Sequence, residues 1–262
     1  GVAVLPLTPR GILLALMIIP SAIAARLGIE VISRTAQIYL VLNLISALIV
    51  VIGVIPGADF TELLPVLASG IRPVWQAAIP SLAVLSLIMA GMWCAPYMRS
   101  GRELTNAVGW SLVTVGGLVI AVTVLAQTLF TYRGVQQMLF PVLTLTRSIQ
   151  IGRVVERLDV VLIGPWFLAV FLLTAYFIYL AATQLAWLGR TRHYRPFVLP
   201  LAAGMGAAAL IIVRSDAQLA EFFTIGSFPL YILVHPLVIP LILLVTRLTR
   251  QPQVTQGGRG KR

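Results

Sequence analysis

The stretch GRVVERLDVVLIGPW, residues 152–166, joins a dense group of charges to the longest uncharged run of the chain. The charged residues of this stretch, which we call the outer charge cluster, are Arg153, Glu156, Arg157 and Asp159. No further charge follows until Arg190. An α-helix needs only about 20 apolar residues to cross a bilayer, so the stretch predicts a spanning helix over 160–189 with a charged end.

Composition places the whole chain among integral membrane proteins. Of its 262 residues, 59% are hydrophobic and only 10% are charged, whereas ordinary globular domains carry about 25% charged residues. The mean hydropathy is +0.99. The net charge is +11, but the basic residues are scattered in short segments between apolar runs. Such scattering is typical of charges that orient a membrane protein, so we expect no nucleic-acid partner.

Uncharged runs predict seven membrane-spanning helices. The runs are 11–25, 35–58, 73–98, 104–132, 160–189, 196–213 and 222–246. The first is short, but Arg26 can extend it by snorkelling. Alternating polarity of the kind found in membrane β-barrels is missing from the sequence, so we predict an all-α integral membrane protein. The connection 131–159 is amphipathic and predicts one or two helices at the outer membrane surface.

The distribution of basic residues predicts the orientation. Numbering the connections alternately places twelve of the 19 basic residues on one side and seven on the other. The richer side takes Arg26, Arg34, Arg99, Arg102, Arg190, Arg192, Arg195 and the basic residues from Arg247 onward. By the positive-inside rule this side is cytoplasmic, which puts the C-terminus inside and the outer charge cluster outside. That cluster is either a solvated helix end or a gating or docking element.

Several motifs together carry a family resemblance. They are FPVLTLTRSIQIGRVVERLDVVLIGPW (140–166), YRPFVLPL (194–201) and LGIEVISRTAQIY (27–39). They resemble the spore germination permease family, the B subunits of nutrient-germinant receptors, which is related to the amino acid–polyamine–organocation transporters. The resemblance implies a ten-helix fold of two inverted five-helix repeats, similar to the LeuT fold. This chain would hold helices four to ten, with helices one to three absent from it.

The resemblance also implies a domain organisation. We expect a single transmembrane domain over 1–250, in which 1–58 closes the first repeat and 73–247 forms the second. The remaining segment, 251–262, is polar and basic and is expected to be a disordered tail. Such folds bind ligand near the membrane midplane, where the first helix of each repeat is broken.

In this chain the first helix of the second repeat is 73–98. Within it Gly91 lacks a Cβ and Pro96 lacks an N–H, so either residue can open the helix. We therefore expect Ala90, Gly91 and Trp93 to contribute to a ligand site, the alternative being that Gly91 allows close helix packing. Trp93 stands where members of the family can carry a glutamate, so this position offers no anionic partner to a cation.

The span 160–189 carries a second candidate ligand site. Tyr176, Tyr179 and Thr183 fall at i, i+3 and i+7 and so share one helix face. The resemblance makes this span the eighth helix, which lines the pathway in related transporters. The face could bind a small zwitterion, or it could serve interhelical hydrogen bonding and interfacial anchoring.

Little in the sequence favours catalysis or metal binding. His235 is the only ionisable residue deep within a predicted span, and intramembrane ionisable groups are functional candidates. A neutral imidazole before Pro236 can instead satisfy a freed carbonyl. One histidine cannot assemble acid–base chemistry at the midplane, and Cys94 is the only cysteine. We therefore expect no enzyme activity, no cofactor and no metal.

These features leave two functional hypotheses. In the first, the chain is the membrane subunit of a spore germinant receptor that senses an amino acid or a similar small polar molecule. Ligand binding then shifts a conformational equilibrium in the spore inner membrane. By resemblance, the receptor's A and C subunits respond to that shift. In the second, the chain is a secondary transporter (permease) for amino acids or cations, although its spans lack the acidic residue that proton coupling commonly uses.

Overall fold

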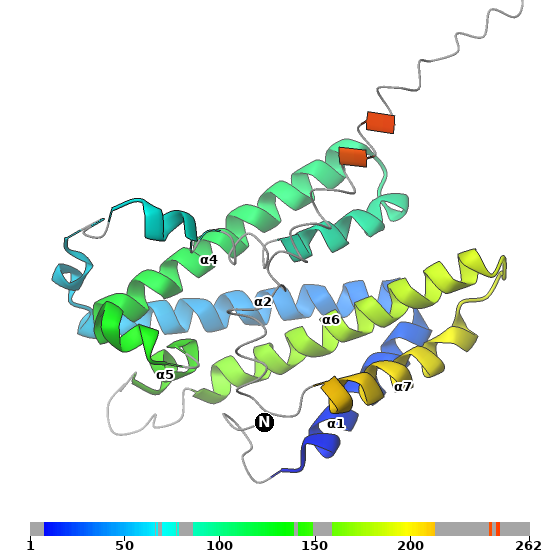
Figure 1. The fold of residues 1–262 in the computed structure, drawn as a ribbon, viewed down its shortest axis with the longest axis horizontal. Coiled ribbons are helices and arrows are strands. Elements are labelled where there is room, and N and C mark those ends of the chain that lie inside the picture. Colours follow the sequence, from blue (N-terminus) through cyan, green and yellow to red (C-terminus); the bar gives the residue numbers. More distant parts are fainter. Residues whose placement is uncertain are drawn as a thin grey trace, which may run out of the picture. The chain divides into compact units, whose positions relative to one another are not determined.

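The computed structural model describes residues 8–65, 67, 70–76, 78, 86–138, 141–148, 159–212, 241–242 and 245–246. Five helices in this part of the chain are long and apolar enough to cross a membrane (Figure 1). They are α1 (Arg10–Leu27), α2 (Ile29–Val54), α4 (Gly101–Gln136), α6 (Asp159–Leu188) and α7 (Arg195–Ile212). Every regular element described is helical, which confirms the predicted all-α architecture for these residues. Seven spans and an inverted-repeat fold remain predictions.

Shorter helices occupy the connections between the long ones. They are the 3₁₀ helices η1 (Ile55–Gly57), η2 (Phe60–Leu63) and η3 (Ser86–Tyr97), and the α-helix α5 (Pro141–Ser148). α5 lies within the connection predicted to be amphipathic, and it buries Leu143, Leu145 and Thr146. Asp159 is the first residue of α6. The other three members of the outer charge cluster lie outside the described residues.

The chain divides into two compact units, and each is described by itself. The larger unit comprises Gly1–Ala68 and Trp110–Gln218, and the smaller comprises Ser69–Gly109 and Leu219–Arg262. The predicted domain boundaries at 58 and 73 and the predicted tail 251–262 remain predictions.

Close helix packing forms the main core of the larger unit. α6 packs against α1, α2 and α7, which lie beside it in Figure 1. Many of the buried residues in this core are small: Ser21, Ala22, Ala24 and Ala25 on α1, and Ala175, Ala182 and Ala202 on α6 and α7. Lipid tails are as apolar as leucine, so helices in a membrane associate through tight packing, which small residues permit.

Two contacts show how close these helices come. The Ser21 hydroxyl on α1 donates to the carbonyl oxygens of Met17 at 2.7 Å and of Phe171 on α6 at 3.1 Å, so one proton is shared between the two helices. On α7, a Cβ added at Gly206 would lie 3.0 Å from Ile18 Cδ1 and 3.3 Å from a methyl group of Leu14. Gly206 therefore occupies a place on α7 where even one methyl group would crowd α1.

A second core of the larger unit lies where α2 ends. Val50 and Val54 of α2 pack with Leu125 and Ala126 of α4 and with Leu145 of α5. α4 is interrupted nearby at Thr131, whose φ of 60° and ψ of 160° are not helical. α5 thus covers the same end of the unit at which α2 ends, consistent with its position in the connection between α4 and α6.

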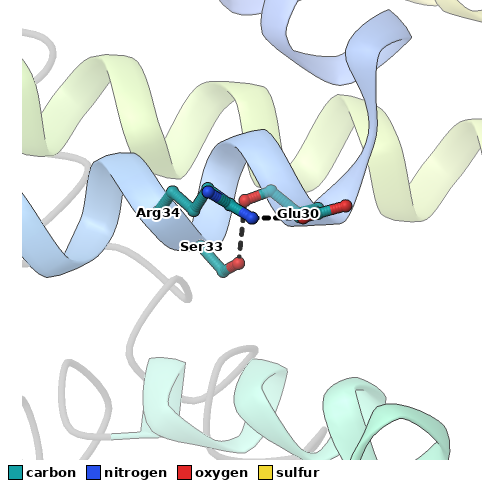
Figure 2. Close-up of polar contacts among 3 residues, drawn as sticks. All are labelled: Glu30, Ser33 and Arg34. Atoms are coloured by element: carbon teal, nitrogen blue, oxygen red, sulfur yellow. Dashed lines mark hydrogen bonds and ion pairs between the residues drawn. The ribbon is translucent and has the colours of Figure 1, made fainter.

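The junction between α1 and α2 differs from the sequence-based prediction. The charges of 26–34 indicated a loop, but only Gly28 separates the two helices. Its φ of 109° lies in the region that glycine adopts without strain. The charged residues belong to the first turns of α2, as Figure 2 shows. Arg34 and Glu30 form an i, i+4 ion pair of 2.7 Å there, and the Ser33 hydroxyl donates to the Glu30 carbonyl oxygen. These residues form a solvated helix end and not a loop.

The smaller unit holds η3 and the start of α4. The Ser100 hydroxyl accepts a hydrogen bond from the Glu103 N–H at 3.3 Å, and the Glu103 carboxylate accepts one from the Arg99 N–H at 3.0 Å. This arrangement resembles a capping box, in which side chains satisfy the unpaired N–H groups of a helix start. It explains why α4 begins at Gly101, before the start of the predicted span at residue 104.

The two glycines of α7 provide a matched test of the α1–α7 contact. We expect Gly206→Leu to lower the thermal unfolding temperature of the purified protein in detergent, because overpacking costs about 1–3 kcal/mol. Gly204→Leu is the control, since no described neighbour lies within 4 Å of a Cβ placed there. Both changes gain the same helix propensity, so equal unfolding temperatures for the two variants would contradict the packing.

Candidate functional site

Four tyrosines line the main core of the larger unit, and we call them the tyrosine cluster. They are Tyr39 of α2, Tyr176 and Tyr179 of α6, and Tyr194 of the connection between α6 and α7. Tyr179 is 5% exposed and the other three are partly buried. Phenol groups bring hydrogen-bonding capacity into an apolar core without carrying a charge, which suits recognition of a small polar molecule.

The depth of the cluster fits a site inside a membrane. With a rise of about 1.5 Å per residue, Tyr176 lies about 18 Å along α6 from Leu188, and Tyr39 lies about 15 Å along α2 from Ile29. These two helix ends lie at the same end of the unit, and the hydrocarbon core of a bilayer is about 30 Å thick. Tyr39 and Tyr176 are therefore at about half depth if that end lies at the membrane surface.

Tyr179 and Tyr194 connect the core to the end of the unit. Their rings meet edge to face, with centroids 5.2 Å apart and planes at 80°. The Tyr194 hydroxyl donates to the Arg26 carbonyl oxygen at 3.4 Å. A Cβ at Gly28 would lie 3.3 Å from the same hydroxyl oxygen. Tyr194 thus touches both the face of α6 that carries Tyr179 and the junction between α1 and α2.

The predicted polar face of α6 contains residues in different surroundings. Tyr179 is buried against neighbouring helices, and its role in ligand binding stays a prediction. The Thr183 hydroxyl donates to the Leu180 carbonyl oxygen at 2.8 Å, so its proton is used within α6 while its lone pairs can still accept. Tyr176 is partly buried, and its ring lies 6.2 Å from that of Phe177. A ligand role for Tyr176 and Thr183 stays a prediction.

The other predicted ligand-site residues lie in the smaller unit. Ala90, Gly91 and Trp93 belong to η3, a 3₁₀ helix of 12 residues. Runs of 3₁₀ structure longer than three or four residues are uncommon and often mark a hinge. No described residue lies within 4 Å of a Cβ placed at Gly91, and Trp93 is 55% exposed. η3 continues through Gly91 without interruption. The expected helix break near Gly91 and the ligand site there stay predictions.

Charged groups lie at the ends of the larger unit. Asp59, beyond the end of α2, accepts hydrogen bonds from the Thr61 hydroxyl at 2.6 Å and the Thr61 N–H at 2.9 Å. These bonds hold the pKa of Asp59 below its usual value.

Among the described residues, no group of three or more His, Cys, Asp or Glu side chains could hold a metal ion. His235 lies outside them.

Sequence reasoning did not assign a role to Tyr39 or Tyr194. Both residues were in the motifs that carried the family resemblance, but no spacing rule links them to the tyrosines of α6. Their shared environment arises only when α2 and the α6–α7 connection pack against α6.

Comparisons with known proteins agree on one family. Residues 1–210 match the family described as spore germination protein. The chain is similar to spore germination protein KB of Bacillus subtilis (strain 168), with 24% identity over 245 residues. The matched region covers 91% of this chain and 65% of that relative, so the chain spans less than two thirds of the relative's length. No solved structure matches the chain significantly.

Two substitutions at Tyr194 separate its ring contact from its hydroxyl contact. An aromatic pair contributes about 0.5–1.5 kcal/mol beyond its buried area, whereas a hydrogen bond of 3.4 Å is long and weak. We therefore expect Tyr194→Ala to lower the thermal unfolding temperature clearly and Tyr194→Phe to leave it almost unchanged. An equal loss in both variants would assign the stabilisation to the hydroxyl and contradict this account.

Proposed function

Because this chain belongs to the spore germination protein family, we propose that it is the membrane-embedded subunit of a spore nutrient-germinant receptor. The observation that carries the proposal is the family match over residues 1–210, which include the tyrosine cluster and η3. The chain would sense an amino acid or a similar small polar molecule in the spore inner membrane, with its C-terminus in the cytoplasm. Its partners would be the A and C subunits of the receptor. The proposal assigns no catalytic step to this chain.

The tyrosine cluster is the part of the larger unit best suited to hold such a ligand. An amino acid carries both donors and acceptors, and a tyrosine hydroxyl can both donate and accept. Tyr39 and Tyr176 contribute hydroxyls from two different helices at about half depth. In the smaller unit, taken by itself, η3 is a separate candidate, because no described neighbour lies within 4 Å of a Cβ placed at Gly91.

Sensing requires only that the ligand bind one conformation more tightly than another. Tyr179 and Tyr194 provide a physical connection through which such a difference can spread. A ligand that shifts α6 near Tyr176 moves Tyr179, three residues along the same helix. The edge-to-face contact then moves Tyr194, which touches the junction between α1 and α2 at Arg26 and Gly28. Partner subunits at that end would receive the change.

Removing one hydroxyl tests the ligand role of Tyr176. We expect Tyr176→Phe, in the full-length protein assembled with its A and C subunits, to raise the germinant concentration for half-maximal germination. Losing one hydrogen bond costs about 0.5–1.5 kcal/mol, which corresponds to a shift of up to roughly tenfold. Tyr132→Phe is the control, because it removes the same group from a side chain that is 53% exposed.

Two results would contradict the proposal. Unchanged germinant sensitivity of Tyr176→Phe, with normal membrane levels, would assign this tyrosine to packing. Saturable uptake of an amino acid by the full-length protein without its A and C subunits would instead favour a transporter.

Filling the space beside Gly91 tests the contribution of η3. We expect Gly91→Leu to impair the germination response while the protein still accumulates in the membrane, because the side chain would take space that a small ligand needs. Gly109→Leu is the matched control, since a Cβ there also meets no described neighbour within 4 Å. A normal dose dependence of Gly91→Leu would contradict a ligand role for η3.

A further inference from the structure

Four arginines gather at one end of the larger unit, where α1 and α6 end and α7 begins. They are Arg26, Arg190, Arg192 and Arg195, and we call this surface the arginine end. All four are exposed. The bond from the Tyr194 hydroxyl to the Arg26 carbonyl oxygen brings the α6–α7 connection against the end of α1.

Within the described part of the larger unit, few acidic groups lie near these arginines. Among the described residues of the larger unit, Glu30 is the only carboxylate at this end, and it is already paired with Arg34 at 2.7 Å. The arginine end therefore presents a local excess of positive charge. As far as the structure describes this end, no acidic side chain outside the Glu30–Arg34 pair would compete with a bound anion.

Backbone hydrogen bonds cap the end of α6, in the connection that carries two of these arginines. The Thr191 N–H donates to the Ala186 carbonyl oxygen at 2.9 Å, and the Arg190 N–H donates to that of Trp187 at 3.1 Å. This is the bonding of a Schellman cap, in which the residue after the helix is left-handed and is usually glycine. Here that residue is Arg190, with φ 50°, although Gly189 directly precedes it. An arginine in the left-handed region is strained, and strained backbone conformations are found preferentially at functional sites.

Exposed apolar side chains lie directly beside the arginines. Trp187 is 77% exposed, Leu188 is 73% exposed and Leu27 is 60% exposed. Tryptophan is enriched at the membrane–water interface, where its ring contacts both regions. The end of α6 therefore offers apolar contact next to guanidinium groups, which match phosphate in geometry and charge.

We propose that the arginine end binds the headgroup of an anionic phospholipid. The guanidinium groups of Arg190, Arg192 and Arg195 hold its phosphate, and Trp187 and Leu188 contact its acyl chains. The apolar residues favour a lipid over a free phosphate, because a free phosphate has no apolar group to contact them. They continue into the exposed apolar faces of the helices, which favours a lipid over an acidic protein segment. The proposal rests on the membrane position of the chain and does not depend on which molecule the protein senses.

The test compares three probes on the full-length protein purified in detergent. Phosphatidylglycerol is the anionic lipid, phosphatidylcholine is the zwitterionic lipid, and glycerol phosphate is the headgroup without acyl chains. Native mass spectrometry measures the bound lipid, and thermal unfolding measures the stabilisation. We expect phosphatidylglycerol to bind and to raise the unfolding temperature more than either other probe, and we expect added salt to weaken its binding.

Charge-matched variants locate the binding site. Replacing Arg190, Arg192 and Arg195 together with Gln should weaken phosphatidylglycerol binding by roughly a hundredfold, since each basic residue near an anionic surface contributes about fivefold. Arg192→Gln alone should weaken it about fivefold. The control replaces Arg10, Arg133 and Arg147 with Gln, which removes the same charge from the opposite end of the unit. It should leave binding almost unchanged.

Four outcomes would overturn the proposal. Equal stabilisation by glycerol phosphate would make the surface a site for a free anion. Equal stabilisation by phosphatidylcholine would remove the role of charge. Equal loss in the opposite-end control would show a general charge effect and no localised site. Failure of phosphatidylglycerol to bind, together with protection of these arginines from phenylglyoxal by a co-purified subunit, would assign the surface to a protein partner.

Discussion

The close approach of α1 and α6 is the contact on which the rest of the larger unit depends. Ala25, Ala175 and Ala182 have no exposed surface, and the Ser21 hydroxyl reaches the Phe171 carbonyl oxygen of the facing helix. Inside a membrane, burial of apolar surface gives no net gain over lipid contact, so close packing and hydrogen bonds hold the helices together. α2 and α7 then pack against the pair, and the tyrosine cluster owes its neighbours to this arrangement.

Long apolar runs made the five spanning helices predictable, but charges were a poor guide to helix ends. Charged residues mark where a chain leaves the hydrocarbon, whereas a helix ends where its backbone hydrogen bonds stop. At 26–34 the first turns of α2 carry the Glu30–Arg34 pair into solvent, so the charges lie on a helix. At the start of α4, the pair Ser100 and Glu103 gave a capping signal that charge counting overlooked.

The candidate site was predictable only where its residues share one helix. Tyr176, Tyr179 and Thr183 follow from helical spacing, because all three lie on α6. Tyr39 and Tyr194 come from segments far away in the sequence, and nothing in a single sequence pairs such segments. Burial of Tyr179 was also beyond prediction, since periodicity identifies a face of a helix and not what covers that face. The six predicted ligand-site residues divide between the two compact units. Ala90, Gly91 and Trp93 lie in the smaller unit, and Tyr176, Tyr179 and Thr183 lie in the larger one.

The single-residue connection at Gly28 restricts how α1 and α2 can move. Two peptide links reach at most about 7 Å, so the end of α1 and the start of α2 must stay close together. Sliding one helix along the other by a turn would need about 5.4 Å of slack, which this connection does not have. Glycine does allow the backbone at this point to rotate. The two helices can thus change the angle between them, but they cannot change their register.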